Sequence, residues 1–133
     1  MENARSDSAW SWNWLRLLML AAALAWTMFL FWGLVAPAET VRQFPFRIWD
    51  KAAHFLLFFP FGILWLAALA LRPAFGLLVV AAGWGIGALT EVLQNEMTKG
   101  RHGELWDFVA DAGAVLFAWA LYYLIVRLRR RTR

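Results

Sequence analysis

Long uncharged runs separated by short polar segments dominate this chain of 133 residues. Residues 17–36 carry no charged side chain, and residues 52–71 are interrupted only by His54. A helix crosses a hydrocarbon core about 30 Å thick with roughly 20 residues. The last run, residues 112–126, reaches that length only if its helix begins near Asp107. The pattern therefore predicts an all-α membrane protein, a four-helix bundle with spans at about 17–36, 52–71, 73–94 and 107–126.

The first run has an alternative interpretation as a cleaved signal peptide. The Ala-Pro-Ala sequence at residues 36–38 resembles the small-residue site that signal peptidase cuts. However, the uncharged run before it is longer than the apolar core of about 7–15 residues that signal peptides have. The sequence therefore favours a retained transmembrane helix, and residues 1–133 are predicted to form a single transmembrane domain.

The composition agrees with a membrane protein. Hydrophobic residues make up 62% of the chain and charged residues 17%, and the mean hydropathy is +0.55. Soluble domains are nearer half apolar. The chain has no cysteine, which excludes disulfides, zinc–thiolate sites, iron–sulfur clusters and thiol catalysis.

The distribution of Lys and Arg predicts the orientation. Five of the thirteen basic residues lie at 127–133, directly after an apolar run, which indicates a cytoplasmic anchor rather than a nucleic-acid site. Four spans place both termini on one side of the membrane. That side holds eight Lys and Arg residues and the other side holds five. The positive-inside rule therefore predicts that both termini are cytoplasmic and that the loops at about 37–51 and 95–107 lie outside.

Small residues predict close packing of the last two spans. Gly83 and Gly87 have the four-residue spacing that lets two transmembrane helices approach closely. No strand pattern precedes them, so they do not indicate a phosphate-binding loop. Ala114 and Ala118 are expected to do the same on the fourth helix.

Polar residues gather where three of the predicted helices reach the outer side. An ionised residue at the centre of a transmembrane helix costs roughly 2.5–3.5 kcal/mol, and less near the interface. We therefore expect these side chains to face the interior of the bundle and to find partners there. They are Asp50, Lys51 and His54 at the start of the second helix, Glu91 and Gln94 at the end of the third, Arg101 in the following loop, and Asp107 and Asp111 at the start of the fourth.

Some of these residues also have a plain structural explanation. An acid at a helix N-terminus caps free N–H groups, and capping explains Asp50 and Asp107 at least as well as function does. A helix gains nothing from Glu91, Gln94 or Asp111 at their positions. The combination therefore favours a functional polar site over a purely structural network of salt bridges.

The order and spacing of these residues resemble the VanZ-like family of small multi-pass bacterial membrane proteins. The resemblance covers roughly residues 45–120. It implies a location in the bacterial cytoplasmic (inner) membrane, a role in the cell envelope and, through the resemblance alone, antibiotic resistance, but it supplies no reaction. One departure is Asp111, where the family often has Asn. The matching motifs are Asp50-Lys51-x-x-His54-Phe55, Glu91-x-x-Gln94, Arg101 with Asp107, and Asp111-x-Gly113-Ala114.

Three functions remain open at this point. The first is binding of, or action on, an anionic envelope lipid or lipid-linked glycan, because two helix N-termini beside basic residues suit phosphate. The acid and base groups would be His54, Glu91, Asp107 and Asp111, and the binding groups Asp50, Lys51, Gln94 and Arg101. The same donors also suit a divalent cation such as Mg²⁺ or Mn²⁺ that bridges to phosphate.

The second function is that of a non-catalytic accessory or scaffold subunit of an envelope enzyme. The third is ion or proton translocation. It is the least favoured, because the acids cluster at one side and nothing ionisable continues across the last three spans.

Overall fold

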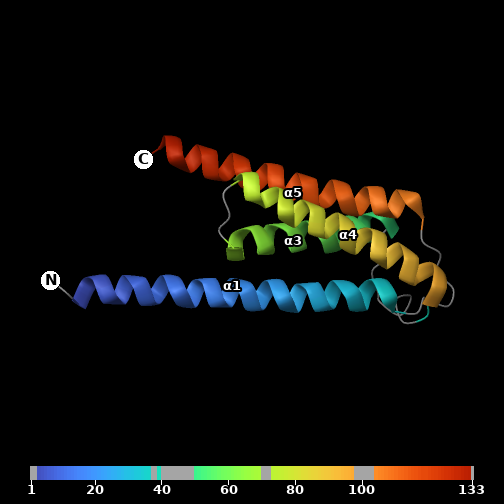
Figure 1. The fold of residues 1–133 in the computed structure, drawn as a ribbon, viewed down its shortest axis with the longest axis horizontal. Coiled ribbons are helices and arrows are strands. Elements are labelled where there is room, and N and C mark those ends of the chain that lie inside the picture. Colours follow the sequence, from blue (N-terminus) through green and yellow to red (C-terminus); the bar gives the residue numbers. More distant parts are fainter. Residues whose placement is uncertain (1–2, 37–38, 40–49, 70–72, 98–103, 133) are drawn as a thin grey trace.

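The fold is helical throughout the part of the chain that the structure describes. The computed structural model describes residues 3–36, 39, 50–69, 73–97 and 104–132, and no strand occurs among them. Its long helices are α1 (Asn3–Val35), α3 (Asp50–Leu69), α4 (Pro73–Met97) and α5 (Leu105–Arg131) (Figure 1). Each contains a stretch that is long and apolar enough to cross a membrane. The prediction of an all-helical protein with four candidate spans is therefore confirmed.

α1 and α5 extend furthest beyond their predicted spans. α1 begins at Asn3, and its apolar stretch runs from Trp14 to Val35. α5 continues through the basic segment as far as Arg131. Arginine is a good helix former, and its charge is favourable at the negative end of the helix dipole. The basic residues of the tail therefore extend the last transmembrane helix.

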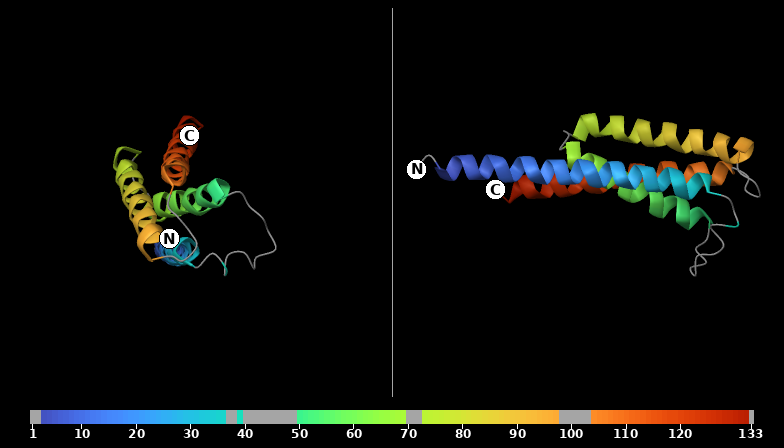
Figure 2. Two further views of the ribbon diagram at one scale, coloured as in Figure 1. Left: turned by 90° about the vertical axis from the view of Figure 1, so that its right-hand side faces the viewer. Right: turned by 90° about the horizontal axis from the view of Figure 1, so that it is seen from below.

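α3 holds the bundle together. It packs against α1 and α5, and α4 packs mainly against α5 (Figures 1 and 2). Both chain termini lie at one end of the bundle, which we call the terminal end (Figure 1). At the other end, the loop end, α1 and α4 finish while α3 and α5 begin. The polar residues singled out above are concentrated near the loop end.

The core between the helices is apolar and is crossed by indole hydrogen bonds. Trp26 Nε1 donates to the backbone oxygen of Leu57 at 2.8 Å, and Trp65 Nε1 donates to Thr27 Oγ1 at 3.0 Å. Both bonds join α1 to α3, and hydrocarbon would offer these groups no partner. The core consists of Leu30, Leu34, Phe58, Phe61, Leu66, Val79, Val80, Ala114 and Val115.

Small residues allow the helices to approach closely. A Cβ atom added at Gly62 of α3 would lie 2.8 Å from the Cβ of Ala118 on α5. One added at Gly83 of α4 would lie 2.8 Å from a methyl group of Val115 on α5. The predicted close packing at Gly83 is therefore confirmed, and Gly62 provides a second contact of the same kind.

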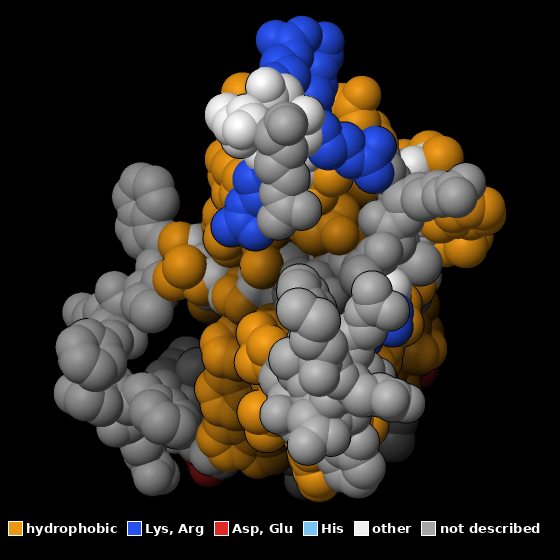
Figure 3. All heavy atoms as spheres, turned by 90° about the vertical axis from the view of Figure 1, so that its left-hand side faces the viewer, with side chains coloured by type: hydrophobic (Ala, Val, Ile, Leu, Met, Phe, Trp, Pro, Cys, Tyr) orange, Lys and Arg blue, Asp and Glu red, His pale blue; other side chains and the backbone are white. Residues whose placement is uncertain are grey.

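Apolar side chains also cover the outward faces of the bundle. Met28, Leu78 and Leu105 expose 74%, 66% and 75% of their surface, as expected for residues that contact lipid rather than water. At the terminal end, Lys and Arg side chains gather over α5 (Figure 3). The molecule therefore has apolar outer faces along its middle, a basic terminal end, and a loop end that carries the described acidic residues of the predicted site.

Replacing Gly62 by Ala is expected to destabilise the protein by about 1–3 kcal/mol, because the new methyl group overlaps Ala118 and forces α3 away from α5. The matched control is Gly85→Ala, since a Cβ atom at Gly85 would have no neighbour within 4 Å among the described residues. Alanine also has the higher helix propensity. Thermal unfolding in detergent should therefore show a lower Tm only for Gly62→Ala, and equal Tm values would contradict this packing.

Candidate functional site

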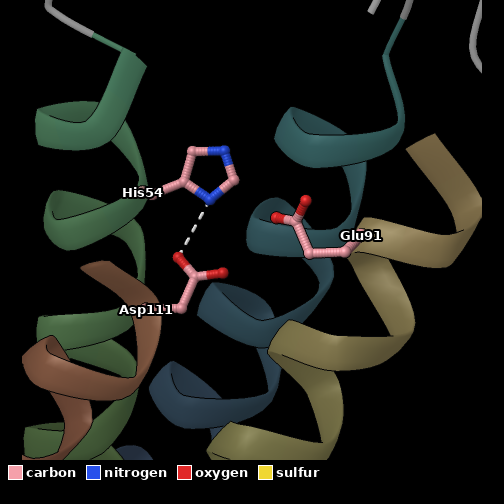
Figure 4. Close-up of side chains that lie close together, drawn as sticks. All are labelled: His54, Glu91 and Asp111. Carbon is pink, nitrogen blue, oxygen red and sulfur yellow. Dashed lines mark hydrogen bonds and ion pairs between the residues drawn. The ribbon is translucent and has the colours of Figure 1, made fainter. Parts of the chain in front are cut away.

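A hydrogen bond between two fully buried side chains forms the centre of the site. His54 is the fifth residue of α3 and Asp111 the seventh of α5, so both lie at a similar depth below the loop end. The His54 Nδ1 atom lies 2.9 Å from Asp111 Oδ1, and both side chains are 0% exposed (Figure 4). Either the imidazole N–H donates to the carboxylate or a protonated Asp111 donates to the imidazole. A proton is therefore shared inside the bundle.

Glu91 adds a third side chain from a third helix. Its carboxylate extends from α4 toward the His54–Asp111 pair (Figure 4). One nitrogen or oxygen from each of the three residues lies within 4.8 Å of the others. The glycine at position 87 makes this approach possible, because a Cβ atom there would lie 3.3 Å from Asp111 Cβ and Oδ2. We call His54, Glu91 and Asp111 the trio.

Several oxygen atoms of these acids are buried without a hydrogen bond. Within the described part of the chain, both oxygens of Glu91 and the Oδ2 atoms of Asp107 and Asp111 have no hydrogen-bond partner. A buried polar atom left without a partner costs roughly 1–3 kcal/mol, and more if it is charged. Such atoms favour a role for the trio beyond holding the helices together.

A second group of charges lies nearer the loop end, and we call it the clasp. Lys51 Nζ at the start of α3 lies 2.9 Å from Glu104 Oε2 and 3.2 Å from Asp107 Oδ1 at the start of α5. The hydrogen bond from Lys51 and the charge of that residue hold the pKa of Glu104 below its ordinary value of 4.5. Asp107 is only 1% exposed, so Lys51 neutralises a buried acid.

The contacts of the clasp show how far helix capping explains the acids at the start of α5. Glu104 occupies the N-cap position of α5 but makes no side-chain capping bond. Asp107 lies in the first turn, where the helix dipole favours an acid, and the described hydrogen bond to its side chain comes from Lys51. The sequence analysis did not predict the pairing of Lys51 with Glu104. The three-residue spacing of Glu104 and Asp107 was the available signal, because it places both acids on one face.

Of the remaining predicted residues, Gln94 has a described partner on another helix, and two others lie outside the described part. Gln94 is 1% exposed and donates from Nε2 to the backbone oxygen of Leu34 at 2.9 Å. This bond ties α4 to the last turn of α1, and the binding role predicted for Gln94 stays a prediction. Arg101 and the side chain of Asp50 lie outside the described residues.

A cavity of about 280 Å³ lies between α4 and α5 beside the trio. Glu91 is the trio member among its lining residues, and the carboxylate oxygens of Glu91 are themselves buried. The cavity also carries the amide of Asn95 and the carboxylate of Glu104, which makes its polar lining acidic. Its full lining is Ala88, Glu91, Asn95, Glu104, Leu105 and Phe108.

Comparisons with known proteins give no match. No family model matches the chain. No curated protein and no solved structure matches it either. The chemistry of the site therefore has to be inferred from the residues of this chain.

Replacing Lys51 by Met is expected to lower the Tm by several degrees, because the buried carboxylate of Asp107 then loses its described ion pair. The control is Glu104→Gln, which removes the partner at the exposed side of the clasp and leaves the Lys51–Asp107 pair intact. This change should have little effect, since exposed ion pairs contribute little. If both variants unfold at the same temperature as the unsubstituted protein in detergent, the clasp does not stabilise the loop end.

Proposed function

We propose that this chain is a VanZ-like integral protein of the bacterial cytoplasmic membrane whose outward-facing site binds or acts on the anionic head group of an envelope lipid or lipid-linked glycan. The observation that carries the proposal is the buried His54–Asp111 pair, with Glu91 beside it and a cavity leading to Glu91. The resemblance to the VanZ-like family rests on residue spacing alone.

The trio has the groups that acid–base chemistry requires. A histidine oriented by a buried carboxylate is a common arrangement for proton transfer at neutral pH. Asp111 fixes the imidazole of His54 through their hydrogen bond. Glu91 lies beside this pair and also lines the cavity, so a change of its rotamer would bring the carboxylate to a head group bound there. We assign proton transfer to the trio. Asp107, which was also a predicted acid–base residue, pairs with Lys51 in the clasp instead.

The position of the cavity suits a lipid ligand. It lies between two candidate membrane spans close to their loop ends. A polar head group could therefore reach Glu91 from the side while its acyl or isoprenoid chain stays among the outward-facing apolar side chains, such as Leu105. A water-soluble substrate would not need this lateral access.

The charge of the site limits how an anion can bind. Among the described residues, the cation at the loop end that contacts the site acids is Lys51, and it is already paired with Glu104 and Asp107. The cavity lining adds carboxylates. An anionic head group therefore requires a further positive charge, and two sources are the loop that contains Arg101 and a bound cation.

The proposed orientation can be tested without background labelling, because the natural chain has no cysteine. In intact cells, a membrane-impermeant maleimide should label Glu104→Cys at the loop end and leave Thr132→Cys at the terminal end unlabelled. Permeabilised cells should label both variants, which serves as the control. The opposite pattern in intact cells would place the site in the cytoplasm and overturn the envelope role.

The ligand class can be tested with a pair of lipids that differ only in their phosphate. Undecaprenyl phosphate is expected to raise the Tm of the detergent-purified protein, and undecaprenol is not, because the site recognises the charged head group. Glu91→Gln and Asp111→Asn should abolish the shift. The matched control is Glu96→Gln, which removes an exposed acid elsewhere on α4.

Equal stabilisation by both lipids, or a shift that survives both substitutions in the trio, would contradict this proposal. Equal stabilisation would indicate that the protein binds only the isoprenoid chain of the lipid. A shift that survives the substitutions would indicate that the phosphate binds elsewhere on the protein.

A second candidate is a non-catalytic accessory or scaffold subunit of an envelope enzyme. The observation that favours it is that Lys51 and Gln94, two predicted binding residues, both use their polar groups to join helices. Under this alternative the trio is a structural network as well. Glu91→Gln would then lower the Tm of the ligand-free protein, and neither lipid would change the Tm of the unsubstituted protein.

A further inference from the structure

We propose that His54, Glu91 and Asp111 form a binding site for one divalent transition-metal cation, with one ligand from each of α3, α4 and α5. This inference deepens the proposed function, and it rests on that function for the role of the cation. It follows from three separate observations: the distances within the trio, the unsatisfied carboxylate oxygens, and the position of the cavity.

The distances within the trio fit a metal site with little movement. Ligand atoms bound at about 2.0–2.2 Å to one ion are roughly 3–3.5 Å apart. Nδ1 of His54 and Oδ1 of Asp111 already lie 2.9 Å apart, so a cation that binds between them would replace the proton they share and release it to solvent. One ligand atom from each of the three residues lies within 4.8 Å of the others. Glu91 has three rotatable side-chain bonds, so a change of rotamer can bring its carboxylate to the shared ion.

The unsatisfied oxygens indicate what the trio lacks. Asp111 is 0% exposed, and its Oδ2 atom points away from His54 toward the side of Glu91 (Figure 4). Among the described residues, this oxygen and both oxygens of Glu91 accept no hydrogen bond. A divalent cation would satisfy them and neutralise two carboxylates at once, which lowers the cost of placing these acids in a membrane span.

The combination of ligand types limits which metal ions the site would bind. One imidazole nitrogen with two carboxylates suits Zn²⁺ or Mn²⁺, whereas Ca²⁺ and Mg²⁺ prefer sites made of oxygen ligands. Three protein ligands also leave at least one coordination position open, as in catalytic rather than structural metal sites. Glu91 also lines the cavity between α4 and α5, so a ligand in this cavity would reach the open position once the Glu91 side chain changes its rotamer.

A cation in the trio also supplies the positive charge that the acidic cavity lacks. A phosphate oxygen could bind the open position of the metal, and His54, Glu91 and Asp111 would hold the ion in place. The site would then recognise an anionic head group through the metal rather than through basic side chains. Binding of the anionic lipid should therefore depend on the metal.

The test measures Mn²⁺ binding to the tag-free, detergent-purified protein after removal of metals with EDTA. Electron paramagnetic resonance of free Mn²⁺ should show one bound ion per chain, displaced by Zn²⁺ but not by equal Mg²⁺. Glu91→Gln and Asp111→Asn should each weaken binding by at least about tenfold, since even indirect changes around metal sites cost this much. The matched control, Glu96→Gln on the exposed end of α4, should bind as the unsubstituted protein does.

Both substitutions in the trio keep the size of the side chain, and circular dichroism and gel filtration check that each variant is folded. Absence of stoichiometric Mn²⁺ binding would overturn the inference. Binding that both variants of the trio retain would overturn it equally, because the ion would then lie elsewhere.

Measuring the Tm with undecaprenyl phosphate, in Mn²⁺ and in EDTA, distinguishes a failure of the metal inference from a failure of the proposed function. If Mn²⁺ binds as expected but undecaprenyl phosphate does not raise the Tm, the metal site stands and the proposed ligand is wrong. If the phosphate lipid raises the Tm equally in Mn²⁺ and in EDTA, and no Mn²⁺ binds, the ligand proposal stands and the metal inference is wrong.

Discussion

A polar side chain inside a transmembrane bundle must find its partner within the protein, because hydrocarbon supplies none. The hydrogen bond between His54 and Asp111 meets this requirement, at 2.9 Å between two side chains that are 0% exposed. It fixes the relative position of α3 and α5, and the clasp around Lys51 fixes the starts of the same two helices. The site therefore depends on the packing of α3 against α5, with α4 contributing Glu91 from a third direction.

The packing in turn depends on small residues at defined places. Gly62 and Gly83 admit Ala118 and Val115 of α5 at distances that a methyl group would prevent. Gly87, one turn beyond Gly83, leaves room for the side chain of Asp111. The glycines that bring α4 onto α5 thus also bring Glu91 toward the buried pair. Structure and site are coupled here, because the same close approach serves both.

The sequence predicted the helical architecture well, since length and hydropathy decide whether a segment can cross a bilayer. It also placed His54, Glu91 and Asp111 among eight polar residues expected to meet at one end of the bundle, because ionisable residues inside apolar runs are expensive and few. It could not say how they pair. Helical spacing shows which residues share a face, but the rotation of each helix depends on contacts such as that of Gly62, which no periodicity reveals. For that reason the sequence predicted a partner for Glu91 but did not predict the ion pair between Lys51 and Glu104.

The central claim is that Glu91 is kept for a ligand and not for stability, and the ligand-free stability of Glu91→Gln tests it most directly. Both carboxylate oxygens of Glu91 are buried without a geometrically well-formed hydrogen bond to the described residues, so replacing the charge by a neutral amide should relieve more desolvation than it costs in attraction. We expect the Tm of this variant in EDTA to equal or exceed that of the unsubstituted protein. A clear fall in Tm would contradict the account, because Glu91 would then be a structural member of the bundle.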